Sequence, residues 1–166
     1  MDTLKAQKHA TRRLNLMYFL CWIVILQLVC YLMGQITQAN LSTWYHPLIK
    51  STLTPPSITF AIVWPVLYVL LAILGAMIFS KENQYSPKIK GLYLTQLILN
   101  CSWTPIFFYL HWVGTALFVL SSMVVITTAL IIASYAKNKK IFFLLMPYLI
   151  WIIFATYLNA IIWLHI

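Results

Sequence analysis

Five long apolar runs, each without a charged residue, divide the chain. The runs are 20 to 24 residues long, and about 20 residues of α-helix cross the hydrocarbon core of a bilayer. Each run therefore predicts one transmembrane helix. We expect an all-α membrane protein, a five-transmembrane-helix bundle that forms a single domain over residues 1–166, with spans at about 14–36, 58–80, 91–110, 115–135 and 141–164.

The composition excludes a soluble globule. Hydrophobic residues make up 63% of the chain and charged residues 8%, whereas soluble domains contain about 45–50% apolar and about 25% charged residues. The connections between the runs are also too short to form an extramembrane domain. Activity is therefore expected within the bundle or at its ends.

The positions of the positively charged residues indicate how the chain is oriented in the membrane. Eleven Lys and Arg residues against two Asp and Glu residues give a net charge of +9. Ten of the eleven fall in the N-terminal tail and in the second and fourth connections. With five spans these segments share one face, opposite Lys50. The positive-inside rule then predicts a cytoplasmic N-terminus and an external C-terminus, and no nucleic-acid partner is expected.

The first connection, residues 37–57, is too apolar to extend into water. We expect it to fold over the bundle as a lid, with Trp44 and Tyr45 at the level of the lipid headgroups. Thr54 followed by Pro55 is typical of a helix N-cap and first helical position, so the second span is expected to start there.

Pro105 is expected to kink the third helix, because proline leaves a backbone carbonyl one turn earlier without its partner.

The spans contain no acidic residue, which excludes several classes of membrane protein. The two carboxylates, Asp2 and Glu82, both lie outside the runs, whereas proton-coupled carriers and carboxylate metal sites need an acid at depth. No glycine-rich phosphate loop is present. The histidines fall at span ends or in connections, which argues against paired axial haem ligands, and the three cysteines show no metal or redox spacing. No metal site is expected.

Neutral polar and aromatic side chains form a stripe on the third span. Their 4-3-4 spacing keeps them on one helix face about 60° wide. Lipid would not tolerate such a stripe, so it faces protein. It predicts either hydrogen bonds between helices or a pocket in which two amides orient a ligand against aromatic walls. The stripe consists of Gln96, Asn100, Trp103 and Phe107.

Two tryptophans lie deeper in the predicted spans than aromatic interface anchors usually do. Trp64 is seven residues into the second span and Trp151 eleven residues into the fifth. At ~1.5 Å per residue they lie ~10 and ~16 Å from the span ends. A buried indole N–H needs a hydrogen-bond partner, and flat aromatic walls suit a flat aromatic ligand.

Three blocks of sequence resemble the TspO/MBR family of membrane proteins, also known as tryptophan-rich sensory proteins, translocator proteins or peripheral benzodiazepine receptors. The blocks occur in the order and on the helices found in that family. They contain Trp44-Tyr45, Lys50, Pro55-Pro56, Trp64 and Leu67-Tyr68; Gln96-Leu97, Leu99-Asn100, Trp103 and residues 105–108; and residues 147–149, Trp151, Phe154-Ala155 and Leu158-Asn159.

The resemblance implies a five-helix bundle, often a homodimer, with a pocket below the first loop that binds porphyrins, haem and synthetic aromatic drugs. Protoporphyrin or haem is then a ligand, and no cofactor is required. The family's two pocket tryptophans match Trp64 and Trp151, its loop tyrosine matches Tyr45, and its small pocket residue on the last helix matches Ala155. The expected ligand-binding residues are Tyr45, Ala61, Trp64, Tyr68, Gln96, Asn100, Trp103, Phe107, Tyr148, Trp151, Ala155 and Leu158.

The chain also departs from the family pattern. Leu53 and Ile58 stand where the family usually has tryptophan near the double proline, and Ile62 stands where it has proline. The first span keeps Gly34 but not the family's glycine-rich packing pattern, so the homodimer stays an open expectation. Residues 163–166 lack the basic residue of the family's cholesterol motif, so no dedicated cholesterol site is expected.

Three functions stay open at this level. The first is a membrane sensor or carrier that binds a tetrapyrrole between the first loop and the second, third and fifth helices. The second is a light- and oxygen-dependent porphyrin-degrading enzyme, in which Trp64 and Trp151 would carry the tryptophan chemistry that the resemblance implies. The third is a transporter or assembly subunit without stable ligand binding. A bacterial cell membrane is the expected location, with the mitochondrial outer membrane as the alternative.

Overall fold

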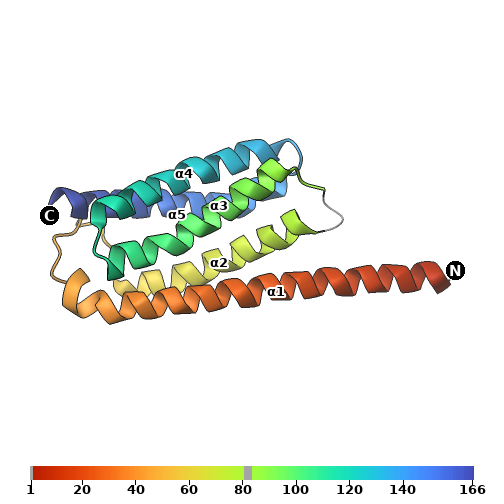
Figure 1. Cartoon of the computed structure of the whole chain (residues 1–166), viewed down its shortest axis with the longest axis horizontal. Helices are drawn as coiled ribbons and strands as arrows, with labels where there is room; N and C mark the ends of the chain where they lie inside the picture. The colour runs from red at the N-terminus through yellow and green to blue at the C-terminus, as the bar shows by residue number, and fades with distance from the viewer. Residues whose placement is uncertain (1, 81–83) are drawn as a thin grey trace.

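Five helices packed side by side make up the molecule (Figure 1). The computed structural model describes residues 2–80 and 84–166, with side chains from residue 16 onward. The described residues contain no strand, so the predicted all-α fold and its five helices are confirmed. The helices are α1 (Asp2–Asn40), α2 (Ser57–Phe79), α3 (Pro87–Thr104), α4 (Val113–Tyr135) and α5 (Lys139–Leu164).

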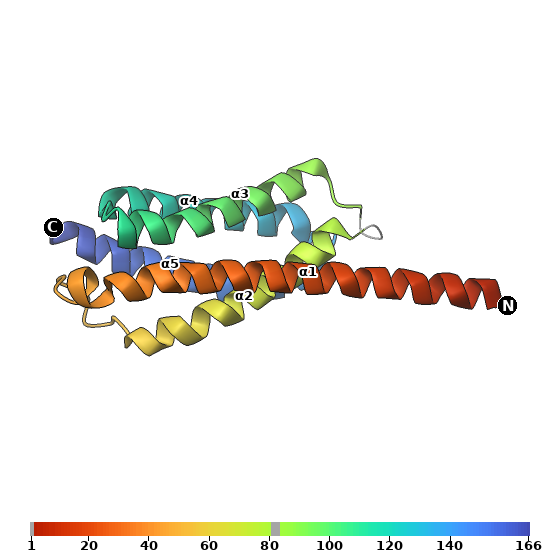
Figure 2. The ribbon, with the colours of Figure 1, turned by 60° about the horizontal axis from the view of Figure 1, so that its bottom comes forward.

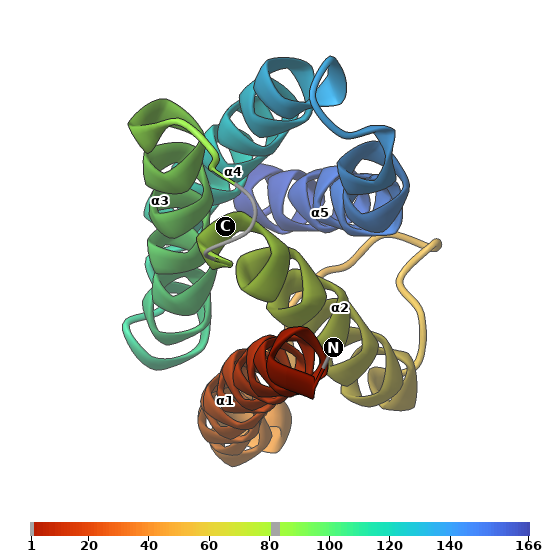
Figure 3. The ribbon, with the colours of Figure 1, turned by 90° about the vertical axis from the view of Figure 1, so that its right-hand side faces the viewer.

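Four of the helical segments are long and apolar enough to cross a membrane. They are Leu16–Tyr45, which includes most of α1, together with α2, α4 and α5. The remaining helix, α3, has 18 residues and carries lysines in its first turn, but it continues directly into the π-helical turn η2 (Pro105–Tyr109). Seen along the bundle, α1 lies beside α2, and α3, α4 and α5 complete the assembly (Figure 3).

The two ends of the bundle differ in charge. The start of α3 and the connection between α4 and α5 lie at the same end as the N-terminus, and the C-terminus lies at the other end (Figure 1). Lys81 and Glu82, and the side chains of the N-terminal basic residues, lie outside the described residues. The described lysines agree with the predicted topology: Lys50 follows α1, while the N-terminal end holds Lys88, Lys90, Lys137, Lys139 and Lys140.

The first helix is longer than the predicted span, and the predicted lid is correspondingly shorter. α1 reaches Asn40 and is followed by the π-helical turn η1 (Leu41–Tyr45), so residues 46–56 alone connect it to α2. In the part of the helix past Ile36, polar side chains bond to the helix's own backbone: Thr37 donates to the Met33 carbonyl at 3.0 Å, and Asn40 to that of Ile36 at 2.8 Å. Figure 2 shows that α1 also projects beyond the other helices at its N-terminal end.

The second helix begins later than the Thr54-Pro55 pair predicts. α2 starts at Ser57, and Pro56 precedes it in an extended conformation with φ −54° and ψ 147°. The prediction was wrong because a second proline follows the first. A residue before proline is disfavoured in the helical region, so Pro55 does not start the helix and the double proline ends the loop instead.

The expected distortion at Pro105 takes the form of a change of helix type. α3 ends at Thr104, and the amide of Leu110 bonds to the Pro105 carbonyl five residues earlier at 2.9 Å. This wider turn places two consecutive aromatic side chains, Phe107 and Phe108, in buried positions. His111, at φ 59°, then turns the chain into α4.

Candidate binding cavity

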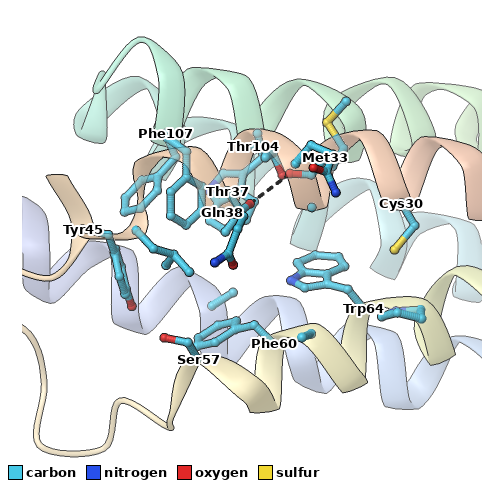
Figure 4. Close-up of a pocket in the computed structure, with 18 of the residues that line it drawn as sticks. Cys30, Met33, Thr37, Gln38, Tyr45, Ser57, Phe60, Trp64, Thr104 and Phe107 are labelled. Carbon is cyan, nitrogen blue, oxygen red and sulfur yellow. Dashed lines mark hydrogen bonds between the residues drawn. The ribbon is translucent and has the colours of Figure 1, made fainter. Parts of the chain in front are cut away.

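A cavity of about 620 Å³ lies between the C-terminal half of α1, the first half of α2, the end of α3 with η2, and the last turns of α5 (Figure 4). Its volume lies within the ~300–1,000 Å³ range typical of small-molecule sites. Most of its lining is apolar or aromatic, and it contains no charged side chain and no histidine.

Nine of the twelve predicted site residues line this cavity. They come from η1, α2, α3, η2 and α5, so the structure brings together positions far apart in the sequence. The remaining three, Gln96, Tyr148 and Trp151, lie outside its lining. The nine are Tyr45, Ala61, Trp64, Tyr68, Asn100, Trp103, Phe107, Ala155 and Leu158.

A hydrogen-bonded network that starts at two lining residues connects α2, α3 and α5. The Tyr68 hydroxyl donates to Asn100 Oδ1 at 2.6 Å, and Asn100 Nδ2 donates to the Tyr148 hydroxyl at 2.8 Å. Gln96 Nε2 donates to the same hydroxyl, and Gln96 and Tyr148 are fully buried. The two amides of the predicted stripe therefore hold helices together, although the buried Gln96 Oε1 accepts no hydrogen bond from the described residues.

Aromatic rings from three elements form a wall along the cavity. The rings of Trp64 and Trp103 stack with centroids 6.0 Å apart and planes at 28°, and Trp103 stacks on Phe107 at 5.5 Å and 19°. Asn159 Oδ1 accepts from the Trp103 indole at 3.4 Å, and Asn159 Nδ2 donates to the Val113 carbonyl at 3.0 Å. The amide of Asn159 thus fixes the ring that joins both stacks.

Trp151 does not share this wall with Trp64. Its ring meets Trp64 edge-on at 6.4 Å and 90°, and it lines a second cavity of about 360 Å³ between the outer surfaces of α2 and α5. Helical side chains lean toward the helix N-terminus. The Trp151 ring therefore lies nearer the N-terminal end of α5 than the part of the cavity that Ala155 and Leu158 line. Its indole N–H is buried and has no hydrogen-bond partner among the described residues.

Comparison with known proteins identifies the architecture. The sequence profile of the TspO/MBR family matches residues 21–164. The chain belongs to the TspO/MBR family. It is therefore a multi-pass integral membrane protein of the translocator and sensory type, as its apolar helices also indicate.

Relatives of this TspO/MBR chain come from animals, bacteria and archaea. It is 37% identical to the translocator protein of Sus scrofa over 125 residues, which are 72% of this chain and 73% of the relative. It is 33% identical over 130 residues to the tryptophan-rich protein TspO of Archaeoglobus fulgidus (77% and 83%). It is 34% identical over 116 residues to the tryptophan-rich sensory protein of Cereibacter sphaeroides (70% and 72%).

The TspO/MBR cavity has a wall on α1 that the sequence prediction missed. The spacing of these positions is helical and could have revealed the wall, but the predicted span ended at Ile36 and the stripe continues beyond it. Gln27 also ties α1 to α2, donating to the Pro65 carbonyl at 2.9 Å. The wall includes Gln27, Cys30, Met33, Gly34, Thr37 and Gln38, and Leu41 of η1 continues it; other unpredicted lining residues include Phe60, Thr104 and Asn159.

The short loop closes the end of the TspO/MBR bundle through Lys50. The ammonium donates to the carbonyls of Tyr45 (3.0 Å), His46 (2.8 Å) and Leu48 (2.8 Å), and it lies 5.1 Å from the centre of the Tyr45 ring. These bonds satisfy carbonyls at the end of the first helical segment. Partial burial lowers the pKa of Lys50 from its ordinary value.

The aromatic residues that precede the loop face the protein. Tyr45 is buried and contacts Phe107 and Phe108, and Trp44 stacks on His111 with centroids 4.3 Å apart and planes at 15°. The loop is also held to α5, because the hydroxyls of Ser51 and Tyr157 lie 3.0 Å apart. Trp44 and Tyr45 therefore help to close the loop end of the bundle.

Proposed function

We propose that this TspO/MBR protein binds a flat aromatic ligand of the tetrapyrrole type, protoporphyrin or haem, in the cavity between α1, α2, α3 and α5. The observation that carries the proposal is the aromatic wall of Trp64, Trp103 and Phe107 along a cavity of about 620 Å³. Each favourable aromatic pairing contributes about 0.5–1.5 kcal/mol beyond the burial of apolar area.

The residues that line the cavity favour recognition of the porphyrin ring over coordination of a metal at its centre. No histidine lines the cavity, and the sulfur atoms there belong to Cys30 and Met33. Stacking against indole and phenyl rings is available to a porphyrin with or without iron. We therefore expect metal-free protoporphyrin to bind, and it is the simplest probe of the site.

The proposal is tested by titrating the purified protein in detergent with protoporphyrin while following tryptophan fluorescence. Quenching should saturate, and Trp64→Phe should weaken the apparent affinity. Trp112→Phe is the matched control, because Trp112 is exposed and lies outside the cavity lining. Quenching that does not saturate, or that is the same in Trp64→Phe and the wild type, would contradict the proposal.

A second candidate is the light- and oxygen-dependent breakdown of a bound porphyrin. The observation that favours it is the series of neighbouring indoles, Trp103, Trp64 and Trp151, of which the first two line the cavity. Illumination under oxygen should then convert a molar excess of protoporphyrin to a new pigment. Bleaching limited to one porphyrin per chain would count against turnover.

The third candidate is a transporter or assembly subunit without stable ligand binding. A simple measurement distinguishes it from the first two. It would give substrate flux in vesicles without a saturable equilibrium titration.

For the host membrane we propose a bacterial cell membrane, with the mitochondrial outer membrane as the alternative. Relatives such as the protein from Cereibacter sphaeroides support this placement.

A further inference from the structure

The inner part of the cavity offers no cation to a negatively charged group. Its polar groups are neutral, and those of Asn100 and Asn159 already bond to protein atoms. Thr104, only 7% exposed, also lines it, and its hydroxyl has no hydrogen-bond partner within the described part of the chain. A carboxylate placed there would lose its hydration without gaining a cation, which costs several kcal/mol.

The one lysine at the loop end of the bundle does not supply that cation. All three donors of the Lys50 ammonium are engaged by backbone carbonyls, and Lys50 does not line the cavity. The other described lysines belong to the opposite end of the bundle. A carboxylate on a bound ligand therefore has to remain where water or neutral donors reach it.

Neutral donors of this kind line the cavity between α1 and the start of α2. Gln35, Gln38 and Ser57 line it there, are exposed, and have no hydrogen-bond partner among the residues that the structure describes. We call these three residues the polar rim. Gln35 and Gln38 are three residues apart and so share a face of α1. Figure 4 shows the Gln38 amide extending from α1 toward the side of α2 where Ser57 and Phe60 lie.

We infer that the cavity takes an amphipathic flat aromatic acid in one orientation. The uncharged edge enters against Trp64 and Trp103, and the carboxylates stay at the polar rim, where the amide N–H groups of Gln35 and Gln38 donate to them. This inference rests on the proposed function and specifies its ligand class: a tetrapyrrole with its acidic groups on one edge, bound without a cationic partner.

The experiment compares protoporphyrin, which has two carboxylates, with its uncharged dimethyl ester. Both should quench tryptophan fluorescence saturably in the wild type, with affinities within about tenfold of each other, because no cation pairs with the acid. The double variant Gln35→Leu/Gln38→Leu should weaken the diacid about tenfold and the ester less than about threefold, since hydrogen bonds to a charged group are the stronger ones.

Two further variants serve as controls for the comparison between the diacid and its ester. Gln84→Leu removes an exposed glutamine amide far from the cavity and should leave both affinities unchanged. Lys50→Met should affect the two ligands equally, because Lys50 orders the loop and touches neither. Size-exclusion elution matching the wild type establishes that each variant is folded.

The possible outcomes distinguish failure of the inferred ligand orientation from failure of the proposed function. Equal weakening of the diacid and the ester in the Gln35→Leu/Gln38→Leu variant, or no weakening of either, overturns the orientation and leaves the proposed function intact. Selective loss of the diacid in Lys50→Met overturns it as well, by assigning the carboxylates to a cation. Failure of both porphyrins to saturate in the wild type overturns the proposed function itself.

Discussion

Single side chains near the cavity divide into those that face a ligand and those that hold the helices. Trp64 and Trp103 form a stacked surface along the cavity, whereas Trp151 meets Trp64 edge-on and faces the smaller outer cavity. Tyr68 belongs to both groups, because it lines the cavity and donates to Asn100. Substitutions at these positions should therefore differ in what they impair.

The two tryptophans that the sequence paired should not be equivalent in ligand binding. Trp64→Phe should weaken protoporphyrin binding about fivefold, since it shortens the stacking surface, a loss of about 1 kcal/mol. Trp151→Phe should change the affinity less than about twofold. Absorbance titrations of the two variants check this, and an equal loss in both would mean that Trp151 also contacts the ligand.

Tyr148 should matter for stability and little for binding. Tyr148→Phe leaves the buried amides of Gln96 and Asn100 without their shared acceptor, which costs about 1–3 kcal/mol. Thermal unfolding in detergent should occur at a lower temperature than in the wild type, with the protoporphyrin affinity within about twofold. Tyr109→Phe, at an exposed position, is the control, and equal unfolding temperatures for the two variants would contradict the role of the network.

Residue types, helical spacing and the resemblance to the TspO/MBR family predicted part of the cavity lining. Nine predicted residues line it because stripes on α2, α3 and α5 face inward together. Gln96 and Tyr148 were placed in the site because spacing gives the face of a helix and not the depth of a side chain behind that face. The orientation of Trp151 depends on how α5 meets α2, which no local pattern encodes.

At the scale of helices, their number and order followed from hydropathy, but their ends did not. The first helix, α1, continues to Asn40, while the double proline delays the start of α2. Each effect is only a few residues long. The extension of α1 nevertheless converts part of an expected lid into a wall of the cavity, because Thr37 and Gln38 belong to its lining.

Side chains of α1 and α3 pack tightly against α2 at Gly75. A Cβ atom at this position would lie 2.5 Å from the Tyr93 hydroxyl and 2.8 Å from the Trp22 ring, and that hydroxyl already donates to the Leu71 carbonyl at 2.7 Å. Gly75→Ala should therefore destabilise the bundle by about 1–3 kcal/mol through overpacking. Thermal or denaturant unfolding in detergent measures the change.

Gly91 provides the matched control for that substitution. A Cβ atom at Gly91, also in a helix, meets nothing within 4 Å, and alanine is the better helix former by about 1 kcal/mol. Gly91→Ala should leave the protein equally stable or more stable than the wild type. A Gly75→Ala variant as stable as Gly91→Ala would show that the three helices do not pack closely at this point.

At the scale of the whole molecule, charge and cavity lie toward opposite ends. The described lysines other than Lys50 are at the end with the N-terminus, and the cavity lies between the loop end of α1 and the last turns of α5. If the positive-inside rule holds, the cavity belongs to the external half of the membrane. A ligand would then reach it from the outer leaflet or the external water.

This orientation is tested with tags at the two termini. The N-terminal tag should be accessible only after the cell membrane is permeabilised, and the C-terminal tag should be accessible in intact cells. Protease protection or antibody labelling gives the answer. Two tags on the same side would contradict five crossings, and the reverse arrangement would place the cavity in the cytoplasmic half.

The central claim is that the aromatic wall of this cavity binds a tetrapyrrole, and an equilibrium titration of protoporphyrin tests it most directly. Its Soret absorbance is followed with the purified protein and with empty detergent micelles in parallel. We predict a shifted band that saturates at one porphyrin per chain and is weakened in Trp64→Phe. A shift that rises without saturation and matches the empty micelles would contradict the claim.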